Sequence, residues 1–230
     1  MKKILLSGSI CLTFGMISCG GSSRGLSADI PVFNTVTVSI TDATPSPIQS
    51  DVVVRFPQRE TINIGPPACN VINTADDVCT GARFPADDLT LTFRSTTVRN
   101  AQGQPATPIP SPVLVEKYKV SFTGCILGVY DFPVGQVLQP DSDTSVVIQP
   151  ITEDMKTRLV QQEQYVYITP DGCPTLYKVW TYQDVCNALA NLEFSLVELN
   201  SGIRRTLKYS VPIRLADYIE PDGCTIRRGV

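Results

Sequence analysis

The sequence has 230 residues, with 19 basic and 22 acidic side chains, a formal net charge of −3 and no histidine. A mildly acidic chain without a basic run is a poor ligand for nucleic acid, so we expect no nucleic-acid partner. The lack of histidine excludes Ser-His-Asp and Cys-His catalysis, HExxH zinc sites and His-ligated haem. Without His, only carboxylates, Lys or Tyr could carry out acid–base chemistry. We predict that the protein is not an enzyme and has no catalytic residue and no cofactor.

Residues 1–18 have the layout of a secretory signal peptide. Two lysines form a positive head, and the apolar stretch of about 14 residues after them is too short for a transmembrane helix. The stretch ends in Met16-Ile17-Ser18-Cys19, which resembles the lipobox of bacterial lipoproteins. In that family a peptidase cuts before the Cys, whose thiol carries a diacylglycerol. The resemblance therefore implies cleavage before Cys19 and lipidation of Cys19.

Residues 19–29 would join this lipid to the rest of the chain. A Gly-Gly-Ser-Ser sequence follows the Cys, which is typical of a flexible tether, and the span to Asp29 is at most about 35 Å. Two or three acyl chains, at roughly 0.8 kcal/mol per buried methylene, give stable anchoring. The resemblance implies an exported protein held in a bacterial membrane, and Gly20 favours the outer membrane. The alternative is a signal cut elsewhere, which releases a soluble protein.

Cleavage would leave 230 − 18 = 212 residues and a net charge of 17 − 22 = −5. This length suits one sandwich-sized domain, which we place at residues 30–230. No second apolar stretch has the length of a membrane span.

Short strands with turn signals between them dominate this domain. Alternating or continuous apolar runs predict strands in residues 35–41, 51–56, 88–95, 116–122 and 144–149. They predict an all-β fold, an antiparallel two-sheet sandwich. The order from about Leu89 onward resembles immunoglobulin-like sandwiches of uncharacterised bacterial lipoproteins, which bears on the fold alone.

Residues 100–112 are rich in Pro and Gln. They are a long loop within one domain or a linker between two. We favour the loop, because a single sandwich needs strands from both sides of this segment.

Asp141 and Asp143 alternate with Ser145 in a predicted loop, as oxygen ligands do at the start of many calcium sites. An EF-hand would need Gly and Glu where this chain has Val146 and Thr152. We therefore predict a solvated acidic turn and no metal site, with Asp141 and Asp143 as a weak calcium candidate.

The one segment with a helical pattern is residues 151–164. Thr152 is a predicted N-cap, two acidic residues follow it, and Met155 and Leu159 share a face. The pattern predicts one short helix, docked on a sheet as a crossover between the two sheets.

Two aromatic pairs follow the helical segment. Tyr165 and Tyr167 share one face of a predicted strand, and Trp180 and Tyr182 share one face of the next. Together they could form an exposed platform for a sugar ring or a protein partner. Alternatively, these aromatics pack in the core.

The last predicted element is a hairpin in residues 191–215. Asn200-Ser201-Gly202 supplies the turn, and Pro212 indicates that the return strand lies at an edge or has a bulge.

Six cysteines remain after the signal peptide and Cys19, and an even number in an exported chain predicts three disulfides. Fifteen pairings are possible; we favour Cys69 with Cys79, which bracket a turn-like loop. A strand of eight residues spans about 26 Å, so Cys173 and Cys186, which flank one, should not pair. The spacing does not favour a thiolate metal site. The six are Cys69, Cys79, Cys125, Cys173, Cys186 and Cys224.

Three functions are compatible with this sequence. The first is a non-catalytic envelope lipoprotein that binds or braces another envelope protein. The second is a carbohydrate- or peptidoglycan-binding module that uses the aromatic platform. The third is a carboxylate-dependent hydrolase, for which no pair of carboxylates is apparent. We favour the first.

Overall fold

The computed structural model describes residues 30–56, 81–106, 109–126, 128–168, 174–182 and 185–217, with backbone alone for residues 56, 163–168 and 174–179. Twelve strands and one short helix make up this part of the chain. They are β1 (Val36–Thr44), β2 (Ile48–Asp51), β3 (Val54–Phe56), β4 (Gly81–Arg83), β5 (Asp87–Thr97), β6 (Val113–Thr123), β7 (Val129–Leu138), β8 (Ser142–Ile151), α1 (Glu153–Thr157), β9 (Gln161–Ile168), β10 (Pro174–Thr181), β11 (Cys186–Glu198) and β12 (Arg204–Ala216).

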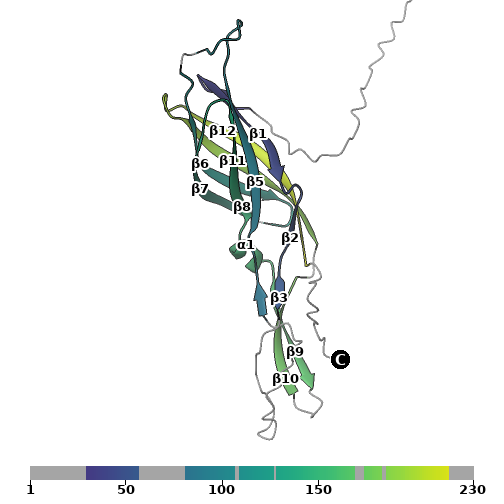
Figure 1. Ribbon diagram of the computed structural model, residues 1–230. Coiled ribbons are helices and arrows are strands. Elements are labelled where there is room, and N and C mark those ends of the chain that lie inside the picture. Colours follow the sequence, from purple (N-terminus) through teal and green to yellow (C-terminus); the bar gives the residue numbers. More distant parts are fainter. Residues whose placement is uncertain are drawn as a thin grey trace, which may run out of the picture.

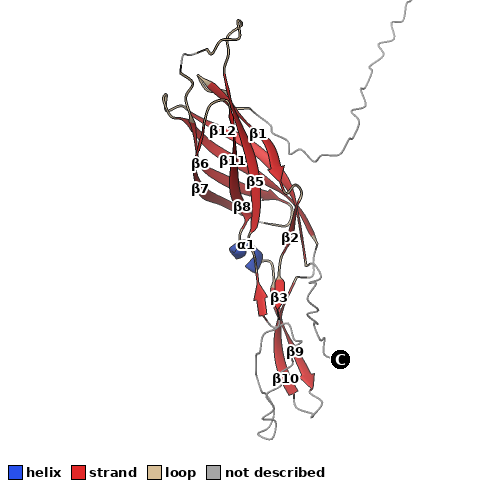
Figure 2. Ribbon diagram, in the orientation of Figure 1, coloured by secondary structure: helices blue, strands red, loops and turns tan. Residues whose placement is uncertain are grey.

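Two sheets form a sandwich, as the strand pattern predicted (Figure 2). One has the order β1-β5-β8 and the other the order β2-β12-β11-β6-β7. All neighbours pair antiparallel except β2 and β12, which are parallel. β1 therefore pairs in one sheet, and β2, which follows it in the chain, pairs in the other. This order, with β1, β5 and β8 facing β6, β7, β11 and β12, is immunoglobulin-like.

The core lies between the two sheets and is built by period-two alternation. The burial pattern of β5 alternates between buried and more exposed residues, with Leu89, Leu91 and Phe93 fully buried. Phe93 meets Phe194 of β11 edge to face, with ring centroids 5.2 Å apart. A fully buried Leu or Phe contributes about 2 kcal/mol, so this dry layer holds the two sheets together.

Two predicted elements differ from the structure. Residues 51–56 form no single strand: β2 ends at Asp51 and β3 begins at Val54. Val52 and Val53 between them are both fully buried, which breaks the alternation of a strand. The predicted helix over 151–164 ends at Thr157, and residues 161–164 belong to β9. Its start was predicted correctly: the Thr152 side chain accepts a hydrogen bond from the Met155 amide.

The C-terminal hairpin is confirmed. β11 and β12 pair along their length, and Gly202 in the turn has a φ of +68°, which favours glycine. Pro212 pairs with Leu189 of β11 and directly precedes Ile213, where the parallel pairing with β2 begins. In the described strands, Pro212 therefore lies on the part of β12 that is still an edge, as expected for a residue without an amide proton.

The molecule is elongated, and its two ends differ (Figure 1). At one end lie the start of β1, the segment between β5 and β6, and the turn between β11 and β12; we call this the N-terminal end. Beyond the opposite end of the sandwich lie β3, β4, α1, β9 and β10, which we call the extension. It is built from two insertions, one between β2 and β5 and one between β8 and β11.

Candidate functional site

The extension is the part of the described chain that a plain two-sheet sandwich does not need. Its strands form two separate ladders, β3 with β4 and β9 with β10. Figure 1 shows the β9–β10 ladder farthest from the N-terminal end. Binding elements are commonly positioned in this way, outside a rigid scaffold that holds them. We therefore treat the extension and its attachment as the candidate site.

The β9–β10 ladder includes three of the four aromatic residues of the predicted platform. Tyr165 pairs with Tyr177 and Tyr167 with Thr175, whereas Trp180 pairs with Gln162. Positions 162 and 165 are an odd number of residues apart, so the register puts position 180 on the face opposite to 165 and 167. The side chains of Tyr165 and Tyr167 lie outside the described residues.

Trp180 and Tyr182 lie near the attachment of the extension to the sandwich. Both are half-buried and pack against the apolar core. The Trp180 ring meets Phe84 edge to face, with centroids 5.6 Å apart. The indole therefore packs β10 against the segment that leads from β4 to β5.

Arg55 of β3 joins three separate segments at this attachment. Its guanidinium donates two hydrogen bonds to the Asp217 carboxylate, at 2.8 and 2.5 Å, and a third from Nε to the Trp180 carbonyl at 2.9 Å. The Arg55 side chain is only 7% exposed. A bidentate pair of this kind fixes direction as well as distance, so Arg55 orients β3 and β10 relative to the end of β12.

Lys156 of α1 makes a second buried attachment. Its side chain is fully buried, and its ammonium lies 3.0 Å from the Asp87 carboxylate and donates to the Asp51 carbonyl at 2.7 Å. The Ser50 hydroxyl donates to the same carboxylate at 2.5 Å. Burial of a charge is costly unless it is paired and hydrogen-bonded, and here the ammonium has both kinds of partner. We call Arg55, Asp87, Lys156, Trp180 and Asp217 the junction.

A disulfide lies at the same end of the sandwich. Cys125 follows β6 and Cys186 begins β11, and their Cα atoms are 5.9 Å apart. Cys186 is therefore not bonded to Cys173, in agreement with the argument from strand length. The other four predicted disulfide cysteines, including the favoured Cys69–Cys79 pair, lie outside the described residues, as does Cys19.

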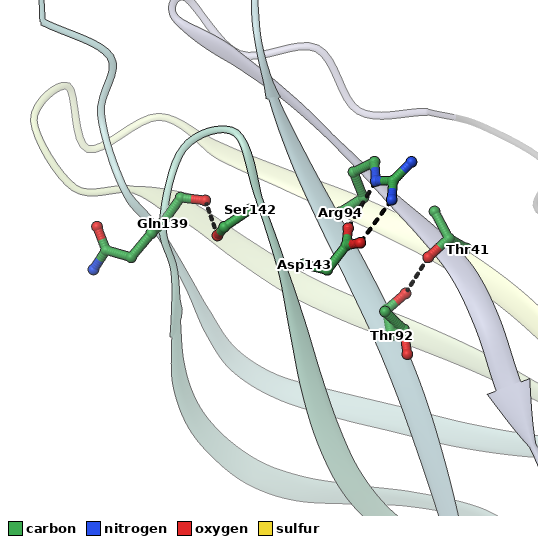
Figure 3. A network of polar contacts seen from close by, with 6 residues as sticks. All are labelled: Thr41, Thr92, Arg94, Gln139, Ser142 and Asp143. Atoms are coloured by element: carbon green, nitrogen blue, oxygen red, sulfur yellow. Dashed lines mark hydrogen bonds and ion pairs between the residues drawn. The ribbon is translucent and has the colours of Figure 1, made fainter.

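The weak calcium candidate lies far from the junction, on β8 and the turn before it. Asp143 forms a bidentate pair with Arg94, which lowers the pKa of the Asp143 carboxyl (Figure 3). Asp141 has a φ of +54° and accepts hydrogen bonds from the Thr97 amide and hydroxyl, which lower the pKa of its carboxyl. Both carboxylates therefore make contacts that stabilise β8 and the turn before it. Among the described residues, no group of three or more Cys, Asp or Glu could hold a metal ion.

A buried carboxylate organises the N-terminal end. Glu198 accepts hydrogen bonds from the Thr35 amide (3.0 Å), the Thr35 hydroxyl (2.6 Å) and the Ser201 hydroxyl. Burial works to raise the pKa of Glu198, but these hydrogen bonds together outweigh it and leave the pKa below its ordinary value. Glu198 thereby ties the start of β1 to the turn that follows β11.

A groove of about 430 Å³ lies between β7 and β8, the edge strands of the two sheets. Phe132 stacks on Tyr118 there, and the Tyr118 hydroxyl donates to the Gln149 carbonyl at 2.9 Å. Burial raises the pKa of Tyr118 to about 12, so this hydroxyl stays protonated at neutral pH. Pro133 and a bulge at Gly135 interrupt β7, which blocks continuous pairing along this edge.

Comparison of the chain with protein-family models, with curated proteins and with solved structures found no match. Within the described part of the chain, no helix is long and apolar enough to cross a bilayer.

Sequence reasoning missed the junction. Lys156 follows an apolar position of a short helix, and Arg55 lies in a β-branched run. Nothing in these contexts marks either side chain as buried, since Lys and Arg are normally exposed. Their partners Asp87 and Asp217 are separated from them by 69 and 162 residues (156 − 87 and 217 − 55).

Proposed function

We propose that this chain is a lipid-anchored protein of a bacterial cell envelope, with a non-catalytic binding role, which presents the extension to a protein partner. The lipid anchor rests on Met16-Ile17-Ser18-Cys19, which resembles a lipobox, and Gly20 after the Cys favours the outer membrane. The proposal thus assigns one end of the molecule to the membrane and the other to a partner.

The observation that carries the proposal is the placement of the two ends. The described chain begins at Ile30, and Val32 bridges to Thr37 near the start of β1, at the N-terminal end. The β9–β10 ladder lies at the opposite end (Figure 1). A lipid on Cys19 would hold the N-terminal end near the membrane surface. The extension would then be the part farthest from that surface.

The junction supports a binding role for the extension. Arg55 and Lys156 fix its direction with buried, hydrogen-bonded charges. An element held in one orientation loses less conformational entropy when it binds a partner, which raises affinity. The sandwich serves in this account as the spacer and scaffold.

The test is site-specific photo-cross-linking in intact cells. A photoreactive phenylalanine analogue replaces exposed Gln162 of β9 in one strain and exposed Lys208 of β12, on the outer sheet face, in a matched control. We expect a discrete protein adduct from position 162 at native abundance and none from position 208. Adducts from position 208 alone, or from neither position, would contradict the proposal.

A further inference from the structure

Exposed apolar side chains gather at the N-terminal end. Eight large apolar side chains of the described residues are strongly exposed, and four of them lie at this end. We call these four the end surface: Ile30, Val32, Ile109 and Leu199. Single exposed apolar residues need no explanation, but a group at one end of an elongated molecule marks an interaction surface.

Backbone and side-chain contacts connect the segments that carry the end surface. Val32 bridges to Thr37 at the start of β1, and its carbonyl accepts a hydrogen bond from Arg205 of β12. The Leu199 amide donates to the Pro112 carbonyl at 3.0 Å, three residues after Ile109. The start of β1, the end of the β5–β6 segment and the β11–β12 turn therefore form one fixed unit.

Hydrogen bonds of Glu198 and Ser111 also hold these segments together. Glu198 accepts from Thr35 and Ser201, the Ser111 amide donates to the Thr35 hydroxyl at 2.9 Å, and the Asn200 amide donates to the Ser111 hydroxyl at 3.0 Å. The polar groups of these segments thus bond to each other beneath the end surface. The apolar side chains above them stay exposed.

The charges around the end surface suit an anionic membrane. Arg99 lies 3.7 Å from Asp141, and Arg204 pairs with Glu116. Among the described residues, Arg205 pairs with the carbonyls of Val32 and Arg204 rather than with a carboxylate. The exposed Arg205 guanidinium beside the apolar side chains could therefore pair with an anionic headgroup, whereas the Glu198 carboxylate at the same end is buried.

We propose that the end surface docks on the lipid bilayer that holds the anchor, so that the molecule stands on its N-terminal end. Ile30 lies only 11 positions (30 − 19) after Cys19, at most about 40 Å of chain. A short tether gives an effective concentration on the order of millimolar, which populates even a weak apolar contact. The inference rests on the lipid anchor of the proposed function and adds which side chains touch the bilayer.

The test uses the acylated protein in vesicles of phosphatidylethanolamine and phosphatidylglycerol that contain a diazirine phospholipid. After illumination, lipid adducts are mapped by mass spectrometry. Val129, Val147 and Val185 are 57%, 61% and 59% exposed, against 58% for Val32, and they serve as internal controls away from the end surface. We expect peptides with Val32, Ile109 or Leu199 to carry about tenfold more label than those with the three control valines.

Two double variants sharpen the result. Replacing Ile109 and Leu199 with Ser should lower labelling of the N-terminal end at least about threefold, whereas replacing Val129 and Val185 with Ser should leave it unchanged. Equal labelling of all exposed valines, or label confined to residues 19–29, would overturn the docking proposal. An adduct with a second copy in place of lipid would do the same. An intact mass taken first separates the two proposals: without acyl chains both fail, whereas an acylated chain with unlabelled end residues overturns the docking alone.

Discussion

The sandwich and the extension are held together by different forces. The sandwich has a dry core in which Leu89, Leu91, Phe93 and Phe194 are fully buried. The extension is held to it by two ion pairs whose cations, Arg55 and Lys156, are buried. Apolar burial is non-directional and strong, so it sets the layers of the fold. Bidentate and multiply hydrogen-bonded charges are directional, so they set the angle at which the extension leaves the sandwich.

The largest expected effect comes from the disulfide where the two regions meet. Replacing both Cys125 and Cys186 with Ser should lower the free energy of unfolding by about 4 kcal/mol, because a loop with a separation of 61 residues is no longer closed in the unfolded chain. Urea unfolding under non-reducing conditions measures this loss. A change below about 1 kcal/mol would show that this link adds little to either region.

Lys156→Met tests whether the junction depends on charge. The substitution leaves the Asp87 carboxylate without its buried ammonium partner, so we expect a loss of about 3 kcal/mol in unfolding free energy. Lys119→Met, at an exposed position of β6, is the matched control and should change stability by less than about 0.5 kcal/mol. Equal stability of the two variants would show that the Lys156–Asp87 pair does not help to hold the extension.

Glu198→Gln addresses the opposite end of the sandwich. Because the folded pKa of Glu198 is lowered, its carboxylate stabilises the fold above the unfolded pKa of about 4.5, and this stability disappears as the pH falls through the folded pKa. We expect the variant to be about 2 kcal/mol less stable at neutral pH. The difference should shrink in acid, as unfolding curves at several pH values would show. A constant difference would contradict the ionised state.

Trp180→Ala should have the smallest and most local effect. Loss of the edge contact with Phe84 should loosen the extension by about 1 kcal/mol and leave the sandwich intact. Hydrogen exchange should therefore rise in β4 and β10 but stay unchanged in β5 and β11. Trp180→Phe, which keeps a ring, is the control. Faster exchange throughout the molecule would show that the two regions do not open independently.

The sequence predicted the sandwich well, since period-two alternation reports which face of a strand is dry. Residues 35–41, 88–95 and 116–122 all lie in or overlap strands of the two sheets, and the turn at Gly202 was located from its residue types. The short helix was placed at the correct start because Thr152 caps it. These signals are local, so a single segment suffices to read them.

The junction could not be predicted, because its signals are not local. Arg55 meets Asp217 across 162 residues, and neither side chain differs in type from an ordinary surface residue. The aromatic positions show the same limit. The sequence shows which aromatic residues share a face within one strand. It does not show the register that pairs Trp180 with Gln162, because that depends on how the two strands align.

The most direct test of the account is the intact mass of the protein extracted from native membranes, with thiols alkylated before and after reduction. We expect cleavage before Cys19, added acyl chains, and six cysteines that react only after reduction. An unacylated mass would mean that no lipid holds the N-terminal end at a membrane. The extension would then no longer be the part presented away from that membrane. Thiols that react without reduction would contradict the predicted set of three disulfides.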